Sequence, residues 1–141
     1  MKKKFRSLKF KEKCFVLLLW VQLIIIDLRL KIIPPSLNKK WIYNYKTDKN
    51  KQNIDKAKIQ KIVNYVNIAA AHSYFFNMSC LRKALIIRRL LKKSKINSNI
   101  LFGLKKNYIT NKYDAHAWVD INGYNINLSN DQRGYQEFKN L

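Results

Sequence analysis

A cysteine and a histidine lie in two sequence contexts that together suit nucleophilic chemistry. Cys80 follows Ser79 and opens an apolar-periodic run, so the thiol is predicted to lie at the first position of a helix. His116 lies in an alternating segment that predicts a strand. The unpaired N–H groups at a helix start favour a thiolate, and an imidazole nearby can take the thiol proton. The pair therefore predicts acyl-transfer or peptide-hydrolysis chemistry.

A third side chain is expected to orient the imidazole. Asn122-Gly123 predicts a two-residue hairpin turn, which would place Asn127 diagonally across from His116 on the same face of the sheet. An amide can fill this role. Asp120 shares the face but lies about 13 Å along the strand, and Asp131 would reach the imidazole only if the hairpin end curls back. Asn127 is therefore preferred, with Asp120 and Asp131 open.

The first 53 residues predict a basic segment, an apolar helix and a connector. Residues 14–26 are apolar, and Pro34-Pro35 ends any helix there. A basic start before an apolar run is also typical of a signal peptide, but no small-residue cleavage site follows. A spanning helix needs about 20 apolar residues, more than this run offers. We expect residues 14–33 to pack on the domain, on a partner or on a membrane surface, a true span being the remaining alternative.

Residues 54–141 predict an α+β domain that positions the pair. Apolar residues three and four positions apart predict a helix over residues 59–70 and another from Ser79 to a break at residues 97–99. Strands are predicted at residues 100–104, 113–121 and 124–128. The predicted fold has N-terminal helices followed by a nucleophile-bearing helix packed on a small antiparallel sheet of three or four strands. Residues 1–53 would form an N-terminal region appended to it.

The composition favours an anionic partner. The formal net charge is +21, from 29 Lys and Arg against 8 Asp and Glu. The two cysteines, Cys14 and Cys80, form no disulfide framework or zinc-binding pattern, which predicts a reduced, cytoplasmic setting without a metal. The phosphate-binding pattern GxxxxGK[ST] is absent, so nucleotide hydrolysis has no support and no cofactor is expected.

The motifs around Cys80 and His116 resemble those of the lasso-peptide biosynthesis B proteins. These are leader peptidases of the transglutaminase-like cysteine protease superfamily, which has a transglutaminase/papain-like fold. The segments that carry the resemblance are residues 79–85, 90–91, 100–104, 115–120 and 122–123. They keep the family's order and distances over about residues 55–138. The sequence departs from the family at Asn127-Leu128, where an acid is expected shortly after the hairpin.

The resemblance implies removal of the leader from a ribosomally synthesised lasso-peptide precursor, as in microcin maturation. Cys80 would be the nucleophile and His116 the base. The implied partners are the precursor leader peptide, a separate leader-recognition protein and an ATP-dependent macrolactam cyclase. Nucleic acid is not an implied partner. The implied location is the cytoplasm, with the inner face of the plasma membrane as a site of attachment for residues 14–33.

Two other interpretations remain open from the sequence. In the first, the chain is a non-enzymatic basic protein that binds anionic membrane or nucleic acid, and Cys80 and His116 are core residues. In the second, the same pair of residues transfers an acyl group to an amine instead of to water. Alkylation of the thiol, salt dependence and detection of an amine-transfer product would separate the three.

Overall fold

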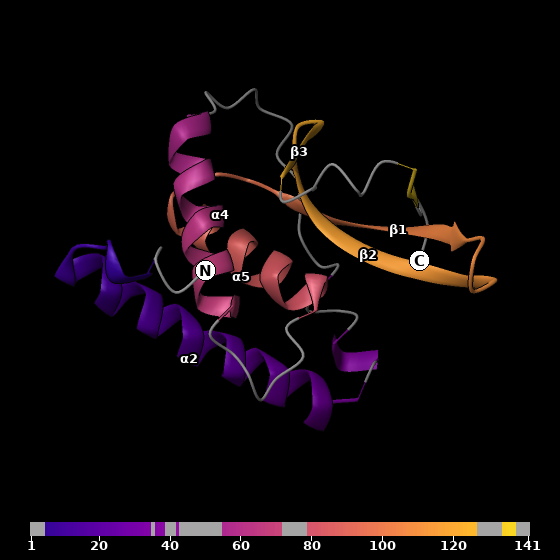
Figure 1. Ribbon diagram of the computed structural model, residues 1–141, viewed down its shortest axis with the longest axis horizontal. Coiled ribbons are helices and arrows are strands. Elements are labelled where there is room, and N and C mark those ends of the chain that lie inside the picture. The colour runs from indigo at the N-terminus through magenta and orange to yellow at the C-terminus, as the bar shows by residue number, and fades with distance from the viewer. Residues whose placement is uncertain are drawn as a thin grey trace.

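The computed structural model describes residues 5–34, 36–38, 42, 55–71, 79–126 and 134–137. Within them, three long helices precede four strands (Figure 1). These are α2 (Phe10–Ile32), α4 (Lys56–Ala71), α5 (Cys80–Lys93), β1 (Asn99–Asn107), β2 (Lys112–Ile121), β3 (Tyr124–Ile126) and β4 (Gln136–Glu137). The chain therefore has the predicted α+β fold, with a small antiparallel sheet beside the helices.

Helix α2 begins before the apolar run because a capping arrangement starts it. The backbone N–H of Lys9 donates to Glu12 Oε2 at 3.0 Å, which satisfies a donor at the helix start. The helix continues to Ile32, and the prolines follow it as predicted. In the described part of the chain, no helix combines the length and apolar character that crossing a bilayer requires.

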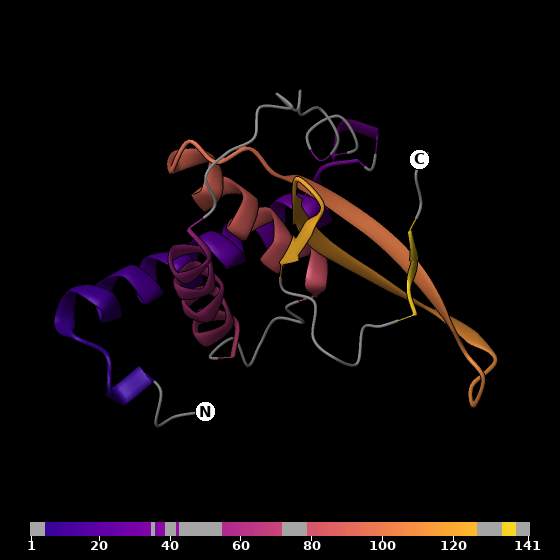
Figure 2. The same cartoon turned by 90° about the horizontal axis from the view of Figure 1, so that it is seen from above.

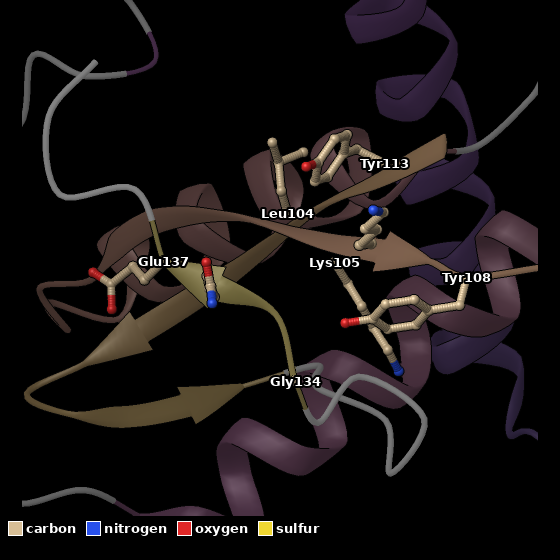
Figure 3. Close-up of a pocket in the computed structure, with 8 residues that line it drawn as sticks. Leu104, Lys105, Tyr108, Tyr113, Gly134 and Glu137 are labelled. Atoms are coloured by element: carbon tan, nitrogen blue, oxygen red, sulfur yellow. The ribbon is translucent and has the colours of Figure 1, made fainter. Parts of the chain in front are cut away.

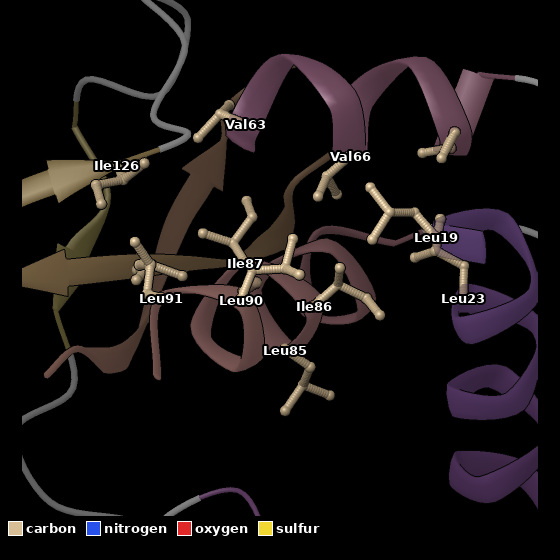
Figure 4. Close-up of a cluster of buried hydrophobic side chains, with 14 of the residues drawn as sticks. Leu19, Leu23, Val63, Val66, Leu85, Ile86, Ile87, Leu90, Leu91 and Ile126 are labelled. Atoms are coloured by element: carbon tan, nitrogen blue, oxygen red, sulfur yellow. The ribbon is translucent and has the colours of Figure 1, made fainter. Parts of the chain in front are cut away.

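The core lies among the three helices and the face of the sheet that α5 covers (Figure 4). Its buried residues come from every layer: Val16, Leu19, Leu23 and Ile26 of α2; Ile59, Val63, Val66, Ala69 and Ala70 of α4; Ala84–Ile87, Leu90 and Leu91 of α5; and Ala117, Val119 and Ile121 of β2. Helix α5 is central, because it contacts α2 and α4 as well as β1 and β2. Burial of its apolar face thus holds the first residue of α5, Cys80, in a defined place.

Helix α2 shares this core with α4 and α5, so one face of residues 14–33 packs on the domain. The predicted boundary between residues 53 and 54 lies outside the described residues and stays a prediction.

The sheet has the order β3-β2-β1-β4, and all its pairs are antiparallel. Strands β1 and β2 pair from Asn99↔Asp120 to Asn107↔Lys112, and Figure 2 shows this long hairpin extending away from the helices. At the other end of β2, Asn122-Gly123 forms the predicted turn. Its φ values of 51° and 86° are both positive, as a type I′ turn requires.

The fourth strand comes from the C-terminal segment, in which the sequence predicted no strand. Gln136 and Glu137 pair with Leu104 and Gly103 at the free edge of β1. This pairing brings Tyr135, the residue just before β4, to the face of the sheet that carries His116.

Candidate active site

Cys80 is the first residue of α5, as predicted, and Ser79 is the N-cap residue with extended backbone (φ −61°, ψ 161°). The Ser79 side chain is used differently from a standard cap. Its Oγ accepts a hydrogen bond from Arg82 Nη1 at 2.9 Å, and it makes no capping hydrogen bond to the helix. The Ser79 side chain therefore does not occupy the backbone N–H groups at the start of α5, beside the thiol.

The thiol contacts the strand that carries His116. The backbone N–H of Ala117 donates to Cys80 Sγ, with 3.3 Å between nitrogen and sulfur. Since Ala117 follows His116 directly, covalent geometry places the His116 Cα within about 6 Å of the sulfur. The structure thus brings together the helix start and the strand that the sequence singled out.

Two aromatic rings lie close to the His116 imidazole. The Trp118 ring is nearly parallel to it, with 6.2 Å between centroids and 14° between planes. The Tyr135 ring is tilted by 45° at 5.4 Å. Trp118 lies two residues along β2, so strand alternation puts it on the His116 face. Tyr135 comes from the other edge of the sheet, next to β4.

Trp118 is itself held at both ends. Its Nε1 donates to Asn125 Oδ1 at 3.1 Å, and its six-membered ring lies over Gly103. A Cβ on Gly103 would lie 2.8 Å from Trp118 Cη2 and 2.9 Å from the backbone oxygen of Gln136. Glycine is therefore required at this position, because any side chain would displace the indole or the β4 backbone.

Two polar residues that sequence reasoning did not select lie at this site. Burial raises the pKa of the Tyr135 phenol, and the Asp114 carboxylate and Cys80 add to the rise. Asp114 accepts a hydrogen bond from Asn107 Nδ2 at 3.3 Å. The alternation that placed Asp120 on the His116 face also places Asp114 there, and nearer, so that signal was available. Tyr135 had no such signal, since its position depends on β4.

The three proposed orienting residues have different outcomes. Asn127 and Asp131 lie outside the described residues, so their roles stay predictions. Asp120 is described. Strand β2 pairs without interruption through this region, and Asp120 lies opposite Asn99 and Asn125, four positions along the strand from His116.

A buried ion pair connects α2 to the start of α5. Asp27 of α2 is 1% exposed and pairs with Arg82, the residue that also donates to Ser79 Oγ. Lys31 pairs with the same carboxylate at 2.8 Å. The hydrogen bond from Lys31 and the charge of Arg82 hold the pKa of Asp27 below its ordinary value, against the opposing effect of burial. We refer to Asp27, Arg82 and Ser79 as the Asp27–Arg82–Ser79 connection.

A pocket of about 720 Å³ adjoins β4 (Figure 3). Its lining combines cations, aromatic rings and strand edge: Leu104, Lys105, Lys106, Tyr108, Tyr113, Gly134, Gln136 and Glu137. Strand alternation places the lining residues Leu104 and Gln136 on the face of the sheet opposite to Gly103 and His116. Among the described residues, no three His, Cys, Asp or Glu side chains gather closely enough to hold a metal ion.

Comparison with protein families gives a match over most of the chain. A family model described as "Transglutaminase-like superfamily" matches residues 22–141, from the middle of α2 to the end of the chain. The comparisons with curated proteins and with solved structures found no match.

Proposed function

The chain belongs to the transglutaminase-like superfamily, and from this premise we propose that it is a cysteine peptidase that removes the leader from a ribosomally synthesised lasso-peptide precursor. The observation that carries the peptidase proposal is the hydrogen bond from Ala117 to Cys80 Sγ, because it joins a thiol at a helix start to the strand of His116. The leader-removal role rests on the motif resemblance around these two residues.

In the proposed reaction, His116 takes the proton of the Cys80 thiol, and the sulfur attacks the carbonyl carbon of the scissile bond. Backbone N–H groups at the start of α5 would donate to the oxyanion that forms. When the C–N bond breaks, the imidazolium gives its proton to the leaving amine and a thioester remains. Water, deprotonated by His116, then attacks the thioester, and the thiol is regenerated.

The pocket next to β4 is suited to a peptide with acidic and aromatic side chains. Lys105 and Lys106 place cations at the pocket next to β4, and Tyr108 and Tyr113 place rings there. The net charge of +21 favours approach of an acidic leader or of an acidic carrier protein. A separate leader-recognition protein and a macrolactam cyclase are the proposed partners.

Mass spectrometry of the candidate precursor, incubated with the protein and the recognition protein, tests the proposal. We expect one cleavage that Cys80→Ala slows by at least about a thousandfold, because the nucleophile is lost. Cys14→Ala is the matched control, since Cys14 is exposed and lies in α2, and it should cleave like the wild type. A folded wild type that leaves the precursor intact, or a Cys80→Ala variant as active as the wild type, would refute the peptidase proposal.

The same spectra separate hydrolysis from acyl transfer. Hydrolysis adds water across the cleaved bond, whereas acyl transfer joins the peptide to an added amine. With an excess of a primary amine present, we expect the hydrolysed product to predominate. A predominant amine adduct that depends on Cys80 would assign the chain to the transferases instead.

A further inference from the structure

Helix α2 exposes a continuous apolar face on the side opposite the core. We define this outer face by seven residues that are 45% to 81% exposed: Phe10, Leu17, Leu18, Val21, Ile25, Leu28 and Ile32. Successive helical residues are 100° apart, so these seven fall in one stripe, about 33 Å long, and the buried Leu19 and Leu23 point the other way. A helix that is apolar all round is normally covered on every side.

Basic residues border the outer face on both sides and near both ends. By helical periodicity, Lys11 and Arg29 lie along one border of the stripe, and Lys13 and Lys31 lie along the other. The part of the helix between these two pairs presents apolar side chains outward. Long basic side chains at such borders can keep their charges at the level of lipid headgroups while their stems lie on apolar surface.

Both acidic residues of α2 are turned toward the protein and neutralised there. Glu12 accepts a hydrogen bond from the Tyr65 hydroxyl and pairs with Lys61 at 3.3 Å. Asp27 is buried and pairs with Arg82 and with Lys31, whose side chain remains 60% exposed. The outer face is therefore apolar, and its charged borders are cationic. These two properties complement a surface that has anionic headgroups above an apolar interior.

We propose that α2 lies in the interface of an anionic membrane, with its outer face buried among the acyl chains and its basic borders at the headgroups. A second copy of the chain fits less well, because it would set two molecules of charge +21 against each other. The opposite face of α2 is part of the core, so the helix lies parallel to the membrane and the domain rests on it.

This orientation would hold the candidate active site near the membrane. Figure 1 shows α2 along the lower edge of the molecule, with α4 and α5 above it. The Asp27–Arg82–Ser79 connection ties the start of α5 to the C-terminal half of α2. The inference goes beyond the proposed peptidase activity and does not depend on it, so Cys80→Ala should bind the membrane like the wild type.

Flotation of the full chain with vesicles tests the proposal. The vesicles contain either phosphatidylcholine alone or an equal mixture with phosphatidylglycerol. We expect binding to the anionic vesicles only, weakened more than tenfold by the double change Leu18→Gln and Ile25→Gln. The matched control is Ile109→Gln, because Ile109 is 97% exposed in the β1–β2 turn, far along the chain from α2. Replacing Lys11 and Lys13 by Gln should weaken binding about fivefold for each charge removed.

Three outcomes would overturn the proposal. The first is no binding to the anionic vesicles by a wild type whose circular dichroism shows it folded. The second is binding that the Leu18→Gln and Ile25→Gln changes leave intact, which would mean attraction of surface charge without insertion. The third is a dimer in light scattering that the same changes dissociate, which would assign the outer face to a second copy.

Discussion

Two aromatic rings, those of Trp118 and Tyr135, lie close to His116, and this determines which single residues matter most. Trp118 and Tyr135 limit where the imidazole can turn, and Gly103 makes room for the indole. A displacement of about 1 Å in a reacting group can reduce a rate a hundredfold. Residues that never contact the substrate can therefore control whether the imidazole reaches the thiol.

Replacing Gly103 by Ala should displace Trp118 or the β4 backbone, since both lie closer than a Cβ allows. We expect a loss of roughly 1–3 kcal/mol in the free energy of unfolding, together with a changed tryptophan fluorescence spectrum and slower peptide cleavage. Urea denaturation and the cleavage assay measure these effects.

Gly123→Ala is the control for backbone strain alone. Gly123 has φ of 86° but nothing within 4 Å of a Cβ. This variant should lose stability through strain yet keep the fluorescence and kcat of the wild type. A Gly103→Ala variant with unchanged fluorescence and cleavage would contradict the role given to Trp118.

Site residues that belong to a local sequence pattern could be predicted from the sequence, whereas those that depend on long-range pairing could not. Cys80 has the position of a helix start, and His116 lies in an alternating strand, so both were predicted close together. Tyr135 reaches the site through pairing between β4 and β1, which are far apart in the sequence. Such pairing leaves no periodic signal in the chain.

Helix α2 contributes both to the core and to the placement of α5, and the sequence predicted only that it could pack on the domain. Its apolar residues were expected to pack on the domain, on a partner or on a membrane surface, and one face is part of the core. Asp27 directly follows the apolar run, and no sequence pattern gives it a structural role. In the structure it is the buried end of the Asp27–Arg82–Ser79 connection, and so α2 helps to place the helix that carries Cys80.

Asp27→Asn should therefore destabilise the protein by about 3 kcal/mol at neutral pH, because Arg82 loses its buried counter-charge. The pKa of Asp27 is lowered in the folded protein, first by the hydrogen bond from Lys31. Its stabilising contribution is therefore present above the ordinary carboxyl pKa, near 4, and is lost as pH falls through the lower folded value. Urea denaturation at pH 7 and pH 3 should show a gap between wild type and variant that narrows in acid.

Glu12→Gln is the control on the same helix. The pKa of Glu12 is also lowered, mainly by the Tyr65 hydroxyl, but its carboxylate lies at the surface. The loss at pH 7 should be clearly smaller than for Asp27→Asn. Equal losses in the two variants would show that the buried position of Asp27 has no special effect.

The hairpins illustrate why some elements could be predicted and others could not. The turn at Asn122-Gly123 needs two positive φ values, and Asn and Gly are the residue types that predict such a turn. Strand β1 runs to Asn107, beyond the predicted residue 104, because pairing with β2 extends the strand through lysines that carry no apolar alternation. The α+β fold class followed from the order of elements, whereas the extent of β1 and the existence of β4 depend on partners distant in sequence.

For the whole molecule, the charge of +21 acts on any partner that approaches. Such long-range attraction is screened as salt rises, since the Debye length falls from about 10 Å at 0.1 M to about 3 Å at 1 M. The pocket beside β4 carries two of these lysines. Recognition of an acidic peptide should therefore weaken with salt more than the chemical step does.

We expect KM for an acidic peptide substrate to rise about tenfold between roughly 0.05 M and 0.5 M salt, with kcat changed less than about twofold. A peptide with the same scissile bond but neutral flanks is the matched control, and its KM should change little. Steady-state cleavage rates at several salt concentrations measure both. Identical salt dependence for the two peptides would contradict electrostatic recognition.

The hydrogen bond from Ala117 to Cys80 Sγ means that a strand amide reports on the state of the sulfur. A thiolate is a strong acceptor, whereas the sulfur of a thioester has given its charge to a covalent bond. In the proposed mechanism, each acylation would therefore release this amide, and each deacylation would capture it again. The hydrogen-exchange rate of the Ala117 amide would then increase with the fraction of enzyme present as the acyl-enzyme.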